Sequence, residues 1–139
     1  MPWWSYALLS AIAASATAIL AKIGVKDVPS NLATAIRTVV VLVFAWGVTF
    51  AFQEHHALKE LKPRSVTFLV LSGIATGLSW IAYFKALQMA PASRVAPLDK
   101  VSLAFTIVLA AVVLGEQISW KLGLGVAFMV AGALLTISK

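Results

Sequence analysis

The sequence predicts an all-α integral membrane protein, a bundle of five transmembrane helices in one domain. Its 139 residues are 61% hydrophobic and 12% charged, whereas a soluble domain is about 45–50% apolar and about 25% charged. The apolar residues form five runs of about 20 residues, the helix length that crosses a hydrocarbon layer about 30 Å thick. A transmembrane barrel would instead show alternating segments of about ten residues. Helices are therefore the expected spanning elements.

Short polar gaps separate the five expected helices within the single domain 1–139. Gly24 and Pro29 end the first, and Pro63 marks the restart after the most polar gap. The first run contains small residues like those of a signal-peptide cleavage site, but no Lys or Arg precedes it, so we expect a span. Neighbouring helices should form antiparallel hairpins because the gaps are short. The expected helices cover about 3–21, 32–52, 66–88, 95–114 and 119–138.

Basic residues in the gaps leave the orientation of the chain open. The formal net charge is +6, and most of the Lys and Arg residues lie in the gaps between the apolar runs, where they would meet anionic lipid headgroups. We therefore expect membrane lipids, and no nucleic acid, as partners. Basic residues in loops favour the cytoplasmic side of a membrane, and here the two sides carry four each, so both orientations of the chain are expected. If the embedded cations Arg37, Lys85 and Lys100 are also counted, the C-terminal side becomes the cytoplasmic one and the N-terminus lies outside. The two loop sets are Lys59, Lys62, Arg64 and Lys121 against Lys22, Lys26, Arg94 and Lys139.

Asp99 and Lys100 lie within the fourth apolar run, where each charge costs about 2.5–3.5 kcal/mol on insertion scales. Alternating helix directions bring Lys22, Arg37 and Lys85 to the same membrane face. On a regular helix Asp99 and Lys100 are about 100° apart, so they should not face each other. We therefore expect Asp99 to pair with Arg37 or Lys22, with Lys100 completing a gate or ion-pair group. The alternative is that these side chains reach the headgroup water.

Polar side chains recur at helical spacing on four of the runs, which is the pattern of a solvated pathway. The alternative for Ser and Thr is hydrogen bonding to a neighbouring helix or to their own backbone, worth about 0.6 kcal/mol a contact. Trp80 and Tyr83 suit either stacking on a substrate or an interfacial aromatic belt. The expected pathway residues are Ser10, Thr17, Arg37, Ser72, Thr76, Trp80, Tyr83, Asp99, Ser102 and Thr106.

Small residues mark the last run as a packing helix. Small side chains let helix backbones approach closely in a membrane. We expect this helix to join two subunits, and the alternative is packing within one chain. The residues are Gly123, Gly125, Ala127, Ala131 and Gly132.

No enzyme is expected from this sequence. It has no nucleophile with a base and no paired carboxylates, and cysteine is absent. His55 and His56 are adjacent, which is a poor spacing for metal ligands, so we expect neither a metal nor a cofactor. Two classes remain: a transporter of a small anionic or zwitterionic solute, or a non-transporting accessory subunit that binds lipid headgroups.

Three groups of residues carry a resemblance to known proteins: Ala86 and Leu87 with Pro91, Ala92 and Ser93; Leu114, Gly115 and Glu116; and the pattern from Gly125 to Gly132. On these residues the chain resembles one EamA repeat of the drug/metabolite transporter superfamily, and its last helix also resembles the dimer helix of small multidrug resistance proteins. Full-length members carry two such repeats in opposite orientation. The resemblance therefore implies half of a ten-helix inverted-repeat transporter, completed by an antiparallel homodimer in the cytoplasmic (inner) membrane of a prokaryote.

Two departures from these families limit what the resemblance implies. Asp99 and Lys100 stand where many EamA repeats have Ser-Pro. Ala14 stands where small multidrug resistance proteins carry a buried Glu. Their cation-antiport mechanism is therefore not carried over.

Overall fold

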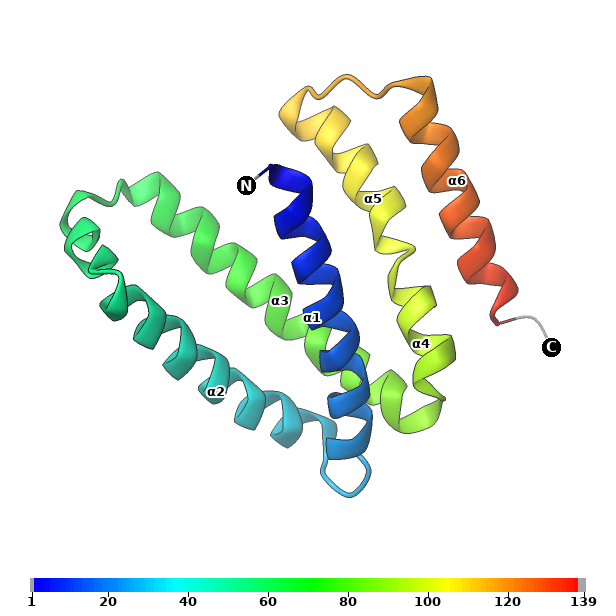
Figure 1. Cartoon of the computed structure of the whole chain (residues 1–139), viewed down its shortest axis with the longest axis horizontal. Helices are drawn as coiled ribbons and strands as arrows, with labels where there is room; N and C mark the ends of the chain where they lie inside the picture. The colour runs from blue at the N-terminus through cyan, green and yellow to red at the C-terminus, as the bar shows by residue number, and fades with distance from the viewer. Residues whose placement is uncertain (1, 138–139) are drawn as a thin grey trace. The chain divides into compact units, whose positions relative to one another are not determined.

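The structure is a computed structural model in which residues 2–137 are described. Within these residues every regular element is a helix (Figure 1). Lys139 and the end of the expected fifth helix lie outside the described residues. The elements are α1 (Trp3–Gly24), α2 (Ser30–Ala51), η1 (Glu54–Glu60), α3 (Pro63–Met89), α4 (Ala92–Asp99), α5 (Ser102–Leu109), η2 (Ala110–Leu114) and α6 (Trp120–Leu135).

Four helical segments are long and apolar enough to cross a membrane: α1, α2, α3 and the segment Ala92–Leu114. Helix α6 is as apolar but has only 16 residues, fewer than the about 20 that a full crossing requires. The prediction of an all-helical membrane protein is therefore confirmed, while the fifth span stays a prediction.

Most large apolar side chains on these helices are exposed, as lipid-facing side chains would be. Val43 and Phe44 on α2 are 65% and 72% exposed, and Leu69 on α3 is 65% exposed. A soluble protein rarely exposes apolar surface on this scale. Lipid tails are as apolar as these side chains, so exposing them to lipid costs little. The exposed apolar surface therefore fits the membrane protein that the composition predicts.

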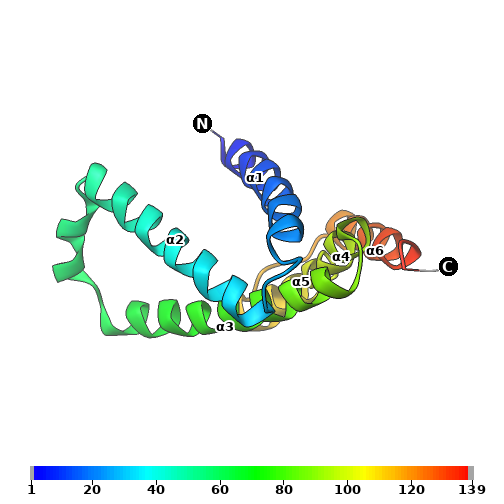
Figure 2. The ribbon, with the colours of Figure 1, turned by 90° about the horizontal axis from the view of Figure 1, so that it is seen from below.

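The chain divides into two compact units, which we describe separately: Ala21–Gln88, and Met1–Leu20 with Met89–Lys139. In the first unit, α2 and α3 are antiparallel and joined through η1, and they approach each other where α2 begins and α3 ends (Figures 1 and 2). The buried residues of this unit lie at that end: Val25, Thr34, Phe84 and Leu87.

In the second unit, α6 runs back along α4 and α5 and contacts both (Figure 1). Val95 of α4 and Ala133 of α6 are buried there. Val126 and Val130 of α6 are half-buried, so α6 turns one face toward its neighbours.

The fourth expected helix, 95–114, is not continuous. Regular helix stops at Asp99 and resumes at Ser102. Around the break, the amides of Lys100, Val101, Leu103 and Ala104 each donate to the carbonyl three residues earlier, at 3.0 Å. These bonds replace the usual four-residue spacing and tighten the backbone locally. The sequence placed two charges at this point, and Pro97, which lies inside α4 three residues before Lys100, is a local signal of an irregular helix that the expectation of a continuous span left out.

Gly115 ends the helical segment that starts at Ala92, and its φ of +70° lies in the left-handed region. A side chain is strained in that region by about 1–2 kcal/mol. We expect Gly115→Ala to lower the midpoint of thermal unfolding, followed by circular dichroism in detergent micelles. Gly47 lies in the interior of α2, where an added Cβ meets no atom within 4 Å. Gly47→Ala should therefore leave the midpoint unchanged or raise it, and equal destabilisation by the two variants would contradict the argument.

Candidate functional site

The first unit holds several of the predicted site residues at the end where α2 and α3 converge. Its loop between α1 and α2 is fixed to the end of α3 by two long polar side chains. Lys22 Nζ donates to the carbonyl of Leu87. Gln88 Nε2 donates to the carbonyls of Val25 at 3.2 Å and Val28 at 2.7 Å. Lys22 thus satisfies a carbonyl in the last turn of α3, a position where a cation also suits the helix dipole.

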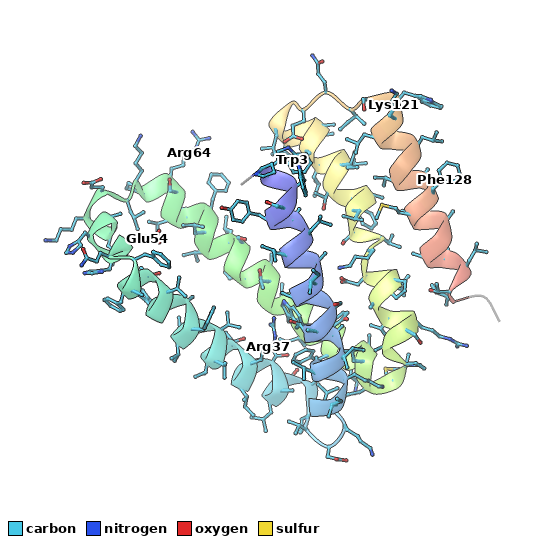
Figure 3. All side chains as sticks on the ribbon, in the orientation of Figure 1. Trp3, Arg37, Glu54, Arg64, Lys121 and Phe128 are labelled. Carbon is cyan, nitrogen blue, oxygen red and sulfur yellow. The ribbon has the colours of Figure 1, made fainter. Side chains whose placement is uncertain are left out.

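Arg37 lies on α2 near the same end (Figure 3). Its Cζ atom is 3.4 Å from the centroid of the Trp80 ring on α3. The rings of Tyr83 and Phe84 each form a T-shaped pair with the Trp80 ring, with centroids 5.4 and 5.3 Å away. Phe84 is buried and Trp80 is half-buried. The structure therefore brings three predicted site residues, Arg37, Trp80 and Tyr83, together on a packed aromatic support.

A cavity of about 190 Å³ adjoins Arg37 within the first unit. Arg37 is the charged residue of its lining, and Phe84 and Val25 are among the apolar ones. A second cavity, of about 400 Å³, is lined by Lys22, Lys26 and Gln88 together with apolar residues. One end of this unit thus carries two cavities, one beside Arg37 and the other beside Lys22 and Lys26.

Asp99 has a partner that the regular-helix geometry did not predict. Its Oδ2 atom lies 3.4 Å from Lys100 Nζ, and both side chains are exposed. The expectation that these neighbours do not face each other is wrong, because the helix breaks at this point. Exposed pairs of this kind contribute about 0–1 kcal/mol. Asp99 and Arg37 belong to different units, so their pairing stays a prediction, as does the gate that includes Lys22 and Lys100.

The threonines of the predicted pathway donate to their own backbone. Thr17 donates to Ala13 O, Thr76 to Ser72 O and Thr106 to Ser102 O, each at 2.9 Å. These bonds fit the alternative in which the hydroxyl groups bond to their own backbone. Each bond uses the single hydroxyl proton, so the oxygen can only accept a further hydrogen bond. Ser10, Ser72 and Ser102 are exposed. Whether these residues line a pathway stays a prediction.

The small residues of α6 lie outside its packed face. Gly123, Gly125, Ala127, Ala131 and Gly132 are all exposed, and a Cβ added at any of the three glycines meets no atom within 4 Å. The face is open for a close helix contact, and its role as a dimer helix stays a prediction.

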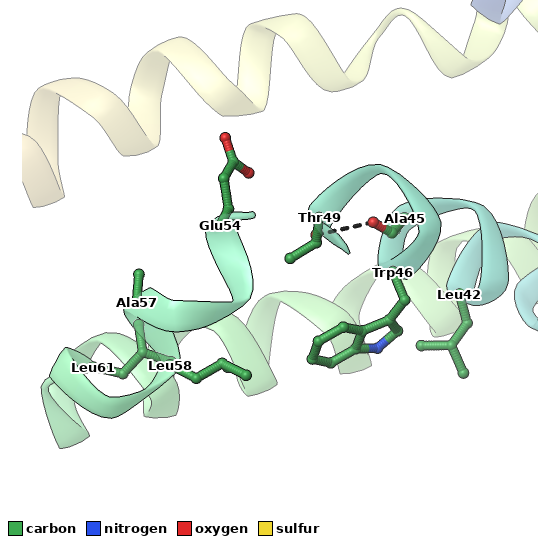
Figure 4. Close-up of a pocket in the computed structure, with 8 residues that line it drawn as sticks. All are labelled: Leu42, Ala45, Trp46, Thr49, Glu54, Ala57, Leu58 and Leu61. Carbon is green, nitrogen blue, oxygen red and sulfur yellow. Dashed lines mark hydrogen bonds between the residues drawn. The ribbon is translucent and has the colours of Figure 1, made fainter. Parts of the chain in front are cut away.

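Sequence reasoning missed two features of the first unit. Gln88 was not singled out, and its only signal is a polar residue near the end of an apolar run. A cavity of about 270 Å³ between α2 and η1 was also missed; Trp46, Leu58 and Glu54 are among its lining residues (Figure 4). Thr49 in its wall donates to Ala45 O at 2.9 Å. Neither feature follows from spacing, because both depend on how the chain folds back at a loop.

The described helices, with their exposed apolar surfaces, define the class of the chain as a helical integral membrane protein. No group of three His, Asp or Glu side chains among residues 2–137 is placed to hold a metal ion. Known proteins specify the class further. The model of the EamA-like transporter family matches residues 1–138, and the chain belongs to that family.

A bacterial relative supports this assignment. The protein described as "Uncharacterized transporter in cobO 3'region", from Sinorhizobium sp, is 47% identical over 133 residues, which cover 96% of this chain and 94% of the relative. No solved structure matches the chain.

Proposed function

We propose that this membrane transporter moves a small metabolite or drug-like solute by alternating access. The observation that carries the proposal is the contact of Arg37 with Trp80 in helices long enough to span the membrane. A cation inside a spanning helix is costly and generally marks a substrate or ion pathway. Membership of a transporter family favours this role over an enzymatic one.

The proposed carrier is an antiparallel homodimer in which α6 supplies the fifth span of each chain. Two observations support it: loop cations that are equal in number on the two sides, and the exposed face of small residues on α6. Two such chains would supply the inverted halves that many transporters carry in one chain. The relative in a bacterium favours the cytoplasmic membrane of a prokaryote as the location.

Exchange in liposomes tests the transport function. We expect purified protein to exchange a radiolabelled solute from a panel of small organic anions and zwitterions, and Arg37→Ala and Asp99→Asn to slow that exchange. Arg64→Ala is the control, because Arg64 lies at the exposed start of α3, with its Cζ 5.9 Å from the Phe68 ring centroid. Absence of exchange for every solute, with no effect of either variant, would overturn the proposal.

Labelling of the loop 53–64 tests the antiparallel arrangement. The chain has no native cysteine, so a single Cys at Lys59 reports that loop alone. We expect a membrane-impermeant maleimide to label Lys59→Cys from both sides of the membrane, using intact cells and inverted vesicles. Labelling from one side only would show a single orientation and exclude the antiparallel dimer.

A second candidate is a non-transporting accessory subunit that binds lipid headgroups. It is favoured by the cavity of about 400 Å³ lined by Lys22 and Lys26, since lysines near the membrane surface attract anionic lipids. Native purification distinguishes the two functions. A constant second protein together with no solute exchange would favour the accessory role.

A further inference from the structure

The stacking of Arg37 on Trp80 fixes where its hydrogen-bond donors point. A guanidinium N–H aimed at the ring would place a nitrogen about 1.3 Å closer than the carbon, well inside van der Waals contact, given that Cζ lies 3.4 Å from the ring centroid. The planar group must therefore lie roughly parallel to the indole. Its five N–H bonds then point sideways, out of the stack.

These donors have no partner within the first unit. No hydrogen bond or ion pair reaches the guanidinium from residues 21–88. The side chain is half-buried, so water replaces those partners only in part. Contact with an aromatic face compensates part of the cost of removing the cation from water, but it uses none of the N–H groups. Arg37 is thus held in place with its bidentate edge available.

The adjoining cavity defines what a ligand of this edge can be. Its volume of about 190 Å³ corresponds to about six water-sized groups at about 30 Å³ each. Apart from Arg37 its lining is apolar or small, with Val25, Val28, Ile36 and Phe84 among the residues. A second charge on the ligand, such as an α-amino group, would meet no charged side chain of opposite sign in this lining and would lose hydration.

We propose that Arg37, positioned by Trp80, is the carboxylate-binding subsite of the carrier and that its substrates are small monocarboxylates with an apolar body. A carboxylate binds the guanidinium fork through two parallel hydrogen bonds. The apolar body fills the adjoining cavity. This inference rests on the proposed transport function and names the substrate class.

Lys22 and Lys26 do not extend this subsite to a phosphate. They line a different cavity, and the Lys22 ammonium donates to the carbonyl of Leu87. One guanidinium alone matches the single charge of a carboxylate. The lining supplies no second cation for the second anion of a dicarboxylate, so a monocarboxylate fits it better.

Binding to detergent-solubilised protein tests the subsite without requiring transport. The probe is 3-methylbutanoate, measured by isothermal titration calorimetry beside the neutral 3-methylbutanamide and beside leucine, which adds an amino group. We expect the carboxylate to bind at least about tenfold more tightly than either analogue, as a charge-assisted bidentate contact predicts. Equal affinity for the carboxylate and the amide would overturn the proposal.

Matched variants assign the binding to Arg37. We expect Arg37→Gln to weaken binding of 3-methylbutanoate by about tenfold or more. Arg37→Lys keeps the charge but loses the fork, so it should give an intermediate loss. If Arg37→Gln does not fold, the decision rests on Arg37→Lys. Arg64→Gln removes the same charge at an exposed site and should bind like the wild type. Unchanged affinity in the folded Arg37 variants would overturn the assignment.

Trp80 is a positioning residue, and its variants separate support from direct contact. Trp80→Phe keeps an aromatic face and should retain most of the affinity for 3-methylbutanoate. Trp80→Leu should weaken that affinity several-fold and should also reduce the preference for the carboxylate over the amide. A Trp80→Leu protein with full affinity and full preference would contradict this role.

The two proposals can fail separately. Binding of 3-methylbutanoate without exchange in liposomes would support the subsite and contradict the carrier. Exchange of other solutes with no monocarboxylate binding would support the carrier and overturn the subsite.

Discussion

Leu87→Ala is expected to lower the free energy of unfolding by about 2–4 kcal/mol. Leu87 is 0% exposed, and Val25 and Phe84 of the same unit are each 2% exposed. Lipid is as apolar as leucine, so transfer from solvent contributes little to packing in a membrane. The loss arises instead from the van der Waals contacts that an unfilled space removes.

The control for this prediction is Leu69→Ala on the same helix. Leu69 is 65% exposed, so its truncation creates no internal space, and we expect a change within about 0.5 kcal/mol. Unfolding by sodium dodecyl sulfate, followed by tryptophan fluorescence in mixed micelles, measures both variants. Similar losses would show that the buried cluster at the end of α3 does not carry the stability of this unit.

Lys22→Met is expected to lower the free energy of unfolding by about 1–3 kcal/mol. The substitution preserves the length of the side chain but removes the ammonium that donates to the carbonyl of Leu87. That carbonyl lies in the last turn of α3, where backbone acceptors have no partner within the helix. Because this carbonyl loses a charged donor, Lys22→Met should destabilise the protein more than the removal of an exposed charge does.

Lys26→Met provides the matched control because Lys26 lines the same cavity and is exposed. Both variants change the net charge equally, so a difference between them reports the contacts that the Lys22 ammonium makes, the bond to Leu87 among them. The same detergent titration measures them, and Lys22→Arg should retain part of the stability. If Lys22→Met and Lys26→Met unfold alike, the contact with Leu87 is not a stabilising one.

The helices were predictable because their signal is local. Apolar runs of sufficient length, bounded by residues such as Pro29 and Pro63, specified α1 to α3 to within a few residues. The same reasoning failed at Lys100. A break that shifts hydrogen bonds from four-residue to three-residue spacing leaves the hydropathy of the segment unchanged, and so hydropathy cannot reveal it.

The side-chain partners were less predictable. Trp80 suited both a stacking site and an interfacial belt, and only the approach of α2 to α3 placed it under Arg37. The contact of Asp99 with Lys100 was not predicted, and the predicted pairing of Asp99 with Arg37 or Lys22 stays a prediction. Both outcomes depend on how a helix is rotated and where it bends, which sequence spacing within one helix does not specify.

The sequence by itself determined that the chain is a helical membrane protein, because the cost of placing backbone and charge in hydrocarbon applies to each segment independently. It also identified Lys22, Arg37 and Trp80 as residues that need a physical explanation. The tertiary structure decided what that explanation is: Lys22 caps the end of α3, and Arg37 lies on Trp80 beside an apolar cavity. These contacts join residues more than forty positions apart in the chain. The approach of α2 to α3 brings Arg37 to Trp80, and the approach of the end of α1 to the end of α3 brings Lys22 to Leu87.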